Sequence, residues 1–138
     1  MKKINHIGIA VPHLEEAVAQ YQTLGFDYRG SEAVASQKVN TAFFRVGESM
    51  VELLEPSDPD SVIAKFLQNR GPGIHHLCVE VDNIEETMAA YKRAGLRLVN
   101  PEPVIGAGGH RVAFVHPKSA GGVLIEIIET ETGSVPDP

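Results

Sequence analysis

Residues 6–26 of the chain read HIGIAVPHLEEAVAQYQTLGF, and residues 76–96 read HLCVEVDNIEETMAAYKRAGL. The two stretches align without a gap at an offset of 70 positions (76 minus 6), so that His6 matches His76. Self-similarity at a fixed offset indicates a structural unit that occurs more than once. We therefore expect one module to be present twice.

Each copy begins with alternating residues typical of a strand, followed by a polar turn and a helix that ends at a glycine. In the first strand, alternation places His6 on the same face as Gly8 and Ala10, with the apolar neighbours on the opposite face. The apolar residues of the following helix recur at helical spacing, and the expected buried stripe is Leu14, Val18, Tyr21 and Leu24. The strand histidines of both copies should thus project from equivalent faces.

A weaker similarity follows each helix, because VELLE at residues 51–55 matches IEIIE at residues 125–129, at an offset of 74 (125 minus 51). Strands are expected at about 26–36, 38–46 and 48–56 of the first copy. Each module is therefore predicted to run β-α-β-β-β. The expected fold class is α+β, with two tandem modules forming an open, curved mixed sheet around a central metal cup.

The chain is predicted to be one domain with a short helical linker between its modules. Module one covers about 1–56, the linker 57–72 and module two about 73–132. The linker helix is expected to start near Asp60 or Ser61 and to end at Gly71. The tail at 133–138 is expected to fray.

Composition narrows the classes of function. A chain of 138 residues with 43% hydrophobic residues can build a core without disulfides, and it has no long apolar run typical of a membrane span or signal peptide, so a cytoplasmic protein is predicted. The formal net charge of -6 disfavours nucleic acid or an anionic membrane as partner. The single cysteine, Cys78, has no partner for a cysteine-based zinc site. A metal would therefore need histidine and carboxylate ligands.

Superposing the repeats produces two equivalent pairs, His6 with Glu52 and His76 with Glu126. Modules related by an approximate twofold axis would bring all four side chains together. Such a set suits Co²⁺, Zn²⁺, Mn²⁺, Ni²⁺ or Fe²⁺ and leaves coordination positions open for water or substrate. Cys78 shares the strand face of His76 and could line the same cavity, although an inert buried thiol is the favoured reading.

Simpler readings exist for each residue alone. A lone strand histidine is more often a half-buried side chain than a ligand, and a lone glutamate can be an edge-strand charge. Repetition favours the metal site, because Glu52 and Glu126 each lie within an apolar strand where an unpaired carboxylate costs several kcal/mol. His75 precedes His76 and should face the helix layer, in a structural role.

The paired modules with histidine and glutamate resemble the vicinal oxygen chelate superfamily, which includes glyoxalase I, ring-cleaving dioxygenases and antibiotic-resistance proteins. Nearly the whole chain is similar to the methylmalonyl-CoA epimerases of that superfamily, most specifically in GIHH at residues 73–76 and HPKSAGGVLIEI at residues 116–127. The resemblance implies a metal-dependent isomerase that interconverts the R and S forms of methylmalonyl-CoA by removing and returning the α-proton through a metal-stabilised enolate. It also implies a homodimer.

By this resemblance His6, Glu52, His76 and Glu126 fall on the metal-ligand positions. Glu126 also falls on an acid/base position, and Glu52 is the candidate for the second proton-transfer group, with a metal-bound water as the alternative. Some relatives carry an acid/base glutamate where this chain has Thr41, and many have aspartate where it has Asn5. Candidates for substrate contacts are Gln37, Lys118 and Ser119, and further candidates for the coenzyme A phosphates are Arg111, Lys65 and Arg70.

Two rival functions fit the same modules. A glyoxalase I-type isomerase uses the same kind of metal cup, and the GIHH and HPKS segments favour the epimerase over it. A non-catalytic ligand-sequestering protein of the antibiotic-resistance type uses the modules without metal, and the four retained ligand residues argue against it.

Overall fold

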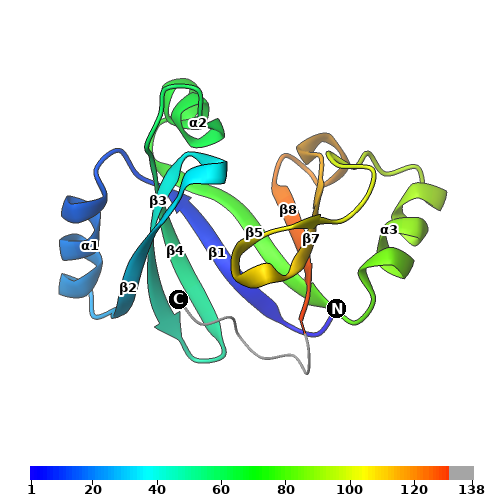
Figure 1. Ribbon diagram of the computed structural model, residues 1–138, viewed down its shortest axis with the longest axis horizontal. Helices are drawn as coiled ribbons and strands as arrows, with labels where there is room; N and C mark the ends of the chain where they lie inside the picture. The colour runs from blue at the N-terminus through cyan, green and yellow to red at the C-terminus, as the bar shows by residue number, and fades with distance from the viewer. Residues whose placement is uncertain (131–138) are drawn as a thin grey trace. The chain divides into compact units, whose positions relative to one another are not determined.

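A computed structural model describes residues 1–130 of the chain (Figure 1). The first copy of the repeat contains β1 (Ile4–Ala10), α1 (Leu14–Thr23), β2 (Asp27–Val34), β3 (Val39–Val46) and β4 (Ser49–Pro56). The second contains β5 (Gly73–Val81), α3 (Ile84–Arg93), β6 (Val104–Ile105), β7 (Arg111–Val115) and β8 (Leu124–Glu129). The predicted β-α-β-β-β order is confirmed in both copies. The end of the second module at 132 and the tail at 133–138 lie outside the described residues.

The strands form one mixed sheet in the order β2-β3-β4-β1-β5-β8-β7-β6. Strands β5 and β8 pair in parallel, whereas β2 with β3, β3 with β4, β6 with β7 and β7 with β8 pair antiparallel. The expected α+β class with a mixed sheet is therefore confirmed. Among residues 1–130, no helix has the length and apolar character needed to cross a bilayer.

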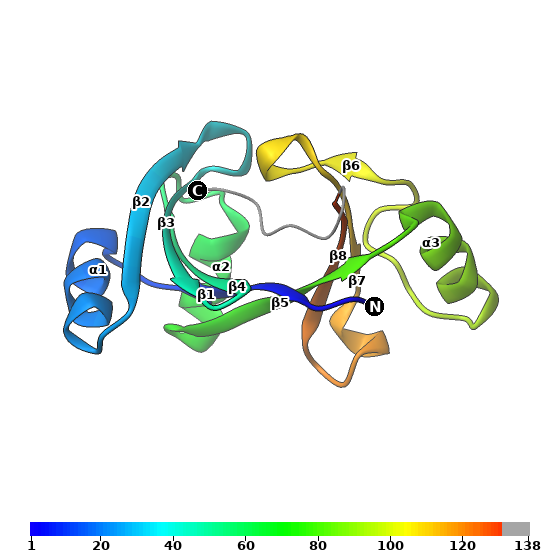
Figure 2. The same ribbon diagram turned by 90° about the horizontal axis from the view of Figure 1, so that it is seen from below.

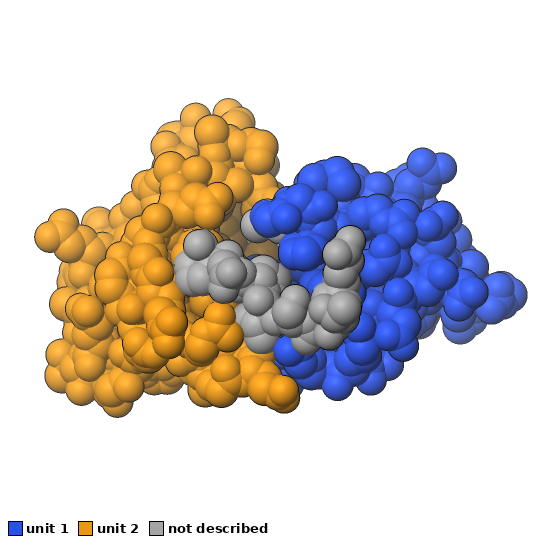
Figure 3. All heavy atoms as spheres, turned by 60° about the horizontal axis from the view of Figure 1, so that its bottom comes forward, with its two compact units in different colours: residues 1–6, 76–137 blue, residues 7–75, 138 orange. Residues whose placement is uncertain are grey.

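The described residues divide into two compact units, which are coloured separately in Figure 3. Among the described residues, one unit holds 1–6 and 76–130, and the other holds 7–75. Each unit therefore contains part of β1 and part of β5.

In the unit of residues 7–75, α1 packs against the face of the sheet that β3 and β4 contribute (Figure 2). The predicted stripe residues Leu14, Val18 and Tyr21 pack there against Phe44 and other buried residues. The prediction for Leu24 is wrong, since this side chain is 70% exposed. The helix ends at Thr23, and Leu24 already forms its C-terminal cap. The helical period therefore no longer applies to that residue.

The other face of β1 in this unit packs under the linker helix α2 (Val62–Arg70), where Ala10 joins Leu54 and Ile63 in a buried cluster. The helix starts as predicted, because the hydroxyl of Ser61 accepts a hydrogen bond from Ala64 N at 2.9 Å. The C-terminal cap is Gly71, whose φ of 76° is unfavourable for residues with a side chain. This packing confirms the alternation predicted for β1.

In the unit that begins at His76, α3 covers β7 and β8 with a core of apolar residues: Val79, Val81, Ile84, Met88, Ala113 and Ile127. The two copies share a feature at the start of the helix. Glu129 at the end of β8 accepts a hydrogen bond from Ile84 N at 3.0 Å. In the same way, Glu55 on β4 accepts one from Leu14 N at 2.7 Å in the other copy. Both glutamates thus satisfy backbone donors that a helix N-terminus leaves unpaired.

Candidate metal centre

Three strands of one compact unit bring His6, His76 and Glu126 together. His6 lies on β1 and His76 on β5, and both side chains are buried. The parallel register of β5 and β8 pairs Cys78 with Glu126. Because His76 lies two residues before Cys78, its side chain points to the same face of β5. The topology therefore gathers residues that are 120 positions apart in the sequence (126 minus 6).

The donor atoms of these side chains form a small triangle. His6 Nε2 lies 3.0 Å from His76 Nε2 and 3.2 Å from Glu126 Oε1. The third side, from His76 Nε2 to Glu126 Oε1, is 3.4 Å. The two imidazole rings are nearly perpendicular, at 89°, with 5.1 Å between their centroids. Three atoms able to offer lone pairs thus converge on one point.

The size of this triangle fits a divalent metal ion. Ligands at about 2.1 Å from Zn²⁺ or a similar ion, at angles between octahedral and tetrahedral values, are separated by about 3.0 to 3.4 Å. The observed sides of 3.0, 3.2 and 3.4 Å fall in that range. Imidazole nitrogen and carboxylate oxygen are also the ligand types that such ions accept. His6, His76 and Glu126 are therefore suited to hold a metal on one side and leave its other positions open.

Charge at the centre is governed by Glu126. Burial alone would raise the pKa of this carboxyl group, but the histidines, which in their protonated form hydrogen-bond it from His6 and place positive charge beside it from His6 and His76, outweigh burial and lower the pKa below its usual value. The carboxylate form therefore prevails at neutral pH. This is the form that binds a metal or accepts a proton.

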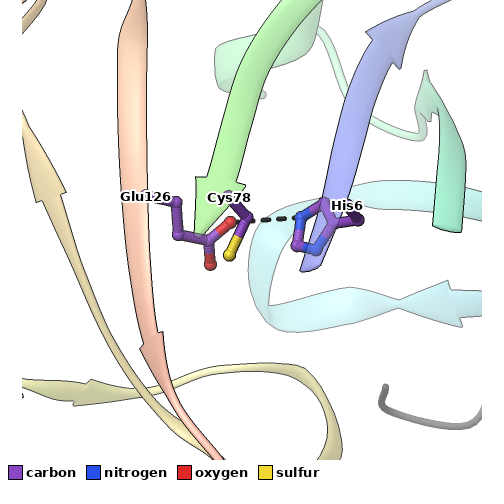
Figure 4. Close-up of side chains that lie close together, drawn as sticks. All are labelled: His6, Cys78 and Glu126. Atoms are coloured by element: carbon purple, nitrogen blue, oxygen red, sulfur yellow. Dashed lines mark ion pairs between the residues drawn. The ribbon is translucent and has the colours of Figure 1, made fainter. Parts of the chain in front are cut away.

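Cys78 is closer to the centre than the sequence alone established. Single donor atoms of His6, Cys78 and Glu126 all lie within 4.8 Å of one another. Figure 4 shows the three side chains pointing toward one another from β1, β5 and β8. The thiol is fully buried and packs with Val112 and Ile128. It lines the site, as one of the sequence readings allowed, with apolar side chains on one side and a hydrogen bond to Glu126 on the other.

A second layer of hydrogen bonds supports His6, and most of it was not predicted. His6 Nδ1 lies 2.7 Å from Asn5 Oδ1. Asn5 Nδ2 donates to Glu80 Oε2 at 3.0 Å, and the hydroxyl of Thr130 donates to Glu80 Oε1 at 2.7 Å. The sequence did contain a signal, because Glu80 is a carboxylate within the apolar strand LCVEV, as Glu52 and Glu126 are in their own strands.

Glu52 lies on β4, in the other compact unit, where it is half-buried and paired in register with Phe43. It shares the face of β4 with Leu54, which packs against Ala10 of β1. Thr41 is buried on β3 at the position paired with Leu54. Participation of Glu52 in the centre stays a prediction.

The candidate substrate residues lie in short turns. Gln37 is exposed and ends the turn Ala35–Gln37. Lys118 is exposed, and the hydroxyl of Ser119 accepts a hydrogen bond from Arg97 N at 2.9 Å. Their contacts with a substrate stay predictions. Arg111 has a different role, because its guanidinium binds Glu85 at 2.8 Å and Glu129 at 2.7 Å.

The predicted His75 interaction with the helix layer is confirmed within the unit of residues 7–75. The ring of His75 meets Phe66 of α2 edge-on, with 5.0 Å between ring centroids. Although adjacent to His76, it therefore faces away from the triangle and has a packing role.

The fold and the donor set can now be compared with known proteins. Residues 5–114 match the family described as the glyoxalase/bleomycin resistance protein/dioxygenase superfamily. This range covers most of both copies of the repeat. The chain belongs to this superfamily.

Within the superfamily, the chain is similar to methylmalonyl-CoA epimerases. It is 42% identical over 127 residues to the mitochondrial methylmalonyl-CoA epimerase of Homo sapiens, covering 91% of this chain and 72% of that protein. It is 41% identical to the ethylmalonyl-CoA/methylmalonyl-CoA epimerase of Cereibacter sphaeroides, covering 91% and 96% of the two chains. A variant of Streptomyces coelicolor methylmalonyl-CoA epimerase, solved with 2-nitronate-propionyl-CoA, matches with a TM-score of 0.88 and 32% identity, covering 96% and 99% of the two chains. These relatives confirm the predicted resemblance and the predicted class of enzyme.

Proposed function

We propose that this protein epimerises methylmalonyl-CoA with the help of a divalent metal held by His6, His76 and Glu126. The observation that carries the proposal is the buried triangle of two imidazole nitrogens and one carboxylate oxygen, with sides of 3.0 to 3.4 Å. The similarity of the chain to epimerases, one of which was solved in complex with 2-nitronate-propionyl-CoA, also supports the proposal. The metal itself, Co²⁺, Zn²⁺, Mn²⁺ or Ni²⁺, is part of the proposal.

Epimerisation requires the loss of the proton on the carbon between the thioester and the carboxylate, followed by proton return to the opposite face. The electron pair of the broken C–H bond passes into the thioester carbonyl, whose oxygen becomes negative. A bound divalent metal would supply Lewis-acid stabilisation of negative oxygen. The histidines would hold the metal in place. Burial of His6, His76 and Glu126 excludes water, which would otherwise weaken electrostatic interactions at the site.

Glu126 is the proposed acid/base group at this centre. Its lowered pKa keeps the carboxylate ionised, so one oxygen can bind the metal while the other is available to a substrate proton. Glu52 is the proposed fourth ligand and second proton-transfer group. The support for this role is the repeat, in which Glu52 matches Glu126. The homodimer and the cytoplasmic location also stay predictions.

Coenzyme A carries phosphates, so some basic groups should meet it despite the formal net charge of -6. Lys118 is the preferred candidate, because its exposed ammonium follows β7, whereas Arg111 is already engaged by two carboxylates. Gln37 and Ser119 are the proposed polar contacts from the two copies. An acyl-CoA is therefore the proposed partner.

Hydrogen exchange at the α-carbon tests the proposed reaction directly. The metal-loaded protein is incubated with methylmalonyl-CoA in D₂O, and deuterium at the α-carbon is followed by NMR or mass spectrometry. The proposal predicts exchange in the wild type and its loss in Glu126→Gln. The matched control is Glu129→Gln, which changes the same type of residue at the end of the same strand but caps α3 instead, and it should retain exchange.

Other outcomes separate the rival functions. Absence of exchange in the metal-replete wild type would refute the epimerase. Turnover of a hemithioacetal instead would indicate a glyoxalase-type isomerase. A protein that binds small molecules tightly without metal and without turnover would indicate a sequestering protein.

A further inference from the structure

Buried side chains linked by hydrogen bonds extend from His6 on the side opposite the metal triangle. Glu80 is fully buried, Asn5 is 1% exposed and Thr130 is 5% exposed. Glu80 lies on β5, Asn5 on β1 and Thr130 directly after β8, so these hydrogen bonds connect three neighbouring segments of the sheet. A carboxylate at this depth is costly unless its oxygens are hydrogen-bonded. Both oxygens of Glu80 have such partners, Asn5 on one and Thr130 on the other.

The direction of these hydrogen bonds follows from the donors present. A carboxylate accepts hydrogen bonds and donates none. Asn5 must therefore present Nδ2 to Glu80, at 3.0 Å, and its other atom, Oδ1, faces His6 Nδ1 at 2.7 Å. The reverse orientation of the amide would set its oxygen against a carboxylate oxygen. The ammonium of Lys3, 3.9 Å from Glu80 Oε2, adds a positive charge on the same side.

We propose that Glu80 is a positioning residue that fixes the tautomer of His6 through Asn5. Because Asn5 Oδ1 can only accept, His6 Nδ1 carries the proton and donates it. In a neutral imidazole the lone pair is then on Nε2. This is the nitrogen that lies 3.0 Å from His76 and 3.2 Å from Glu126. Glu80 therefore selects the form of His6 whose free lone pair faces the centre.

The amide at position 5 suits this arrangement. An asparagine can donate to a carboxylate with one atom and accept from an imidazole with the other. An aspartate at the same place would put two carboxylates about 3 Å apart, where one of them would tend to take up a proton. Glu80 thus orients the amide of Asn5, and the amide oxygen of Asn5 in turn determines which nitrogen of His6 carries the proton. The consequence for metal binding rests on the proposed function, but the tautomer is a property of the metal-free protein.

The first test uses the wild-type chain and needs no substitution. The protein is labelled with ¹⁵N-histidine and stripped of metal with EDTA, and two-bond ¹H–¹⁵N spectra are recorded at a pH where the His6 ring is neutral. The expected result is a protonated Nδ1 and an unprotonated Nε2. A neutral His6 with its proton on Nε2 would overturn the proposal, whatever the protein catalyses.

Two substitutions then test the role of Glu80. In Glu80→Gln the new amide can donate to Asn5 Oδ1, which releases the fixed orientation of Asn5. We expect the opposite His6 tautomer to become populated and Zn²⁺ affinity, measured by titration against a chelator, to fall by about 10- to 100-fold. The control Thr130→Val also removes a hydrogen bond from Glu80 but leaves the Asn5 contact, so it should keep the tautomer.

Each outcome has one meaning for the proposal. If Glu80→Gln keeps both the tautomer and the Zn²⁺ affinity of the wild type, Glu80 does not position His6. If Thr130→Val and Glu80→Gln shift the tautomer equally, the effect is general loosening of the core and the proposal is also refuted. If Glu80→Gln does not fold, the wild-type spectrum decides. The expected tautomer in a protein that lacks α-proton exchange would leave this proposal standing and refute the proposed function.

Discussion

Substitution of Glu129 by glutamine should lower stability in a way that depends on pH. Glu129 accepts hydrogen bonds from Ile84 N at 3.0 Å, at the start of α3, and from Arg111 at 2.7 Å. A negative charge at a helix N-terminus contributes about 0.3 to 1 kcal/mol, and hydrogen bonds to a charged group are stronger than neutral ones. We therefore expect Glu129→Gln to lower the free energy of unfolding by about 1 kcal/mol at pH 7, or Tm by about 3 °C.

The pH dependence follows from the pKa of Glu129. The hydrogen bond from Arg111, followed by that from Ile84, lowers the pKa of this carboxyl group below its usual value of 4.5. In the folded state the group therefore binds a proton less tightly than in the unfolded chain. Its stabilising effect is complete above pH 4.5 and declines as the pH falls through the lowered pKa. The difference between wild type and Glu129→Gln should accordingly shrink as the pH falls below 4.5, within the range where such carboxyls become protonated, about pH 1 to 5.

Urea unfolding at pH 7 and at a series of pH values below 4.5 measures these differences, and the repeat offers a matched control. Glu55 has the same place in the first copy, where it accepts hydrogen bonds from Leu14 N at 2.7 Å and Asn40 Nδ2 at 3.0 Å. Since its described partners are neutral groups, Glu55→Gln should cost less than Glu129→Gln. A Glu129→Gln deficit that stays equally large throughout the acid series would refute the electrostatic explanation, and no deficit at pH 7 would refute the capping role.

Three further outcomes are expected. Ile84→Ala should destabilise by about 2 to 5 kcal/mol in thermal or urea unfolding, because Ile84 is fully buried, whereas Leu24→Ala should change stability by less than about 0.5 kcal/mol; equal effects would contradict the described core. Glu52→Gln should weaken metal binding and slow α-proton exchange, and unchanged values of both would remove Glu52 from the centre. The Co²⁺-loaded protein should lack a sulfur-to-cobalt charge-transfer band and Cys78→Ser should keep its Co²⁺ affinity, because the buried thiol of Cys78 hydrogen-bonds Glu126 and packs against apolar side chains, which favours the protonated, non-ligating form; a band abolished by the substitution would make Cys78 a ligand.

The order of the elements could be predicted from the repeat because each copy carries strong local signals. Alternation in β1 and the helix stop at Gly25 depend on neighbouring residues, so they are readable in the sequence. His6 and His76 were found because repetition marks both at once. Glu126 followed from the matching strand in which it lies. The apolar stripe of α1 was extended one residue too far, to Leu24, because the period does not reveal where a helix ends.

The support of the site could not be predicted in the same way. Asn5 and Glu80 are 75 residues apart, and their hydrogen bond exists because β1 and β5 are neighbours in the sheet. The capping roles of Glu55 and Glu129 likewise depend on where a strand end meets the start of a helix. Long-range partners of this kind have no local pattern. The local signal that the sequence does carry is a carboxylate within an apolar strand, and Glu80 shares it with Glu52 and Glu126.

His6, His76 and Glu126 are proposed to bind one divalent ion. Crystals grown with Co²⁺ or Zn²⁺ and measured at the absorption edge of the metal test this binding most directly. One anomalous peak is expected at about 2.1 Å from His6 Nε2, His76 Nε2 and Glu126 Oε1. A fully folded, metal-saturated crystal with no peak at these three atoms, or with its ion bound elsewhere, would contradict it.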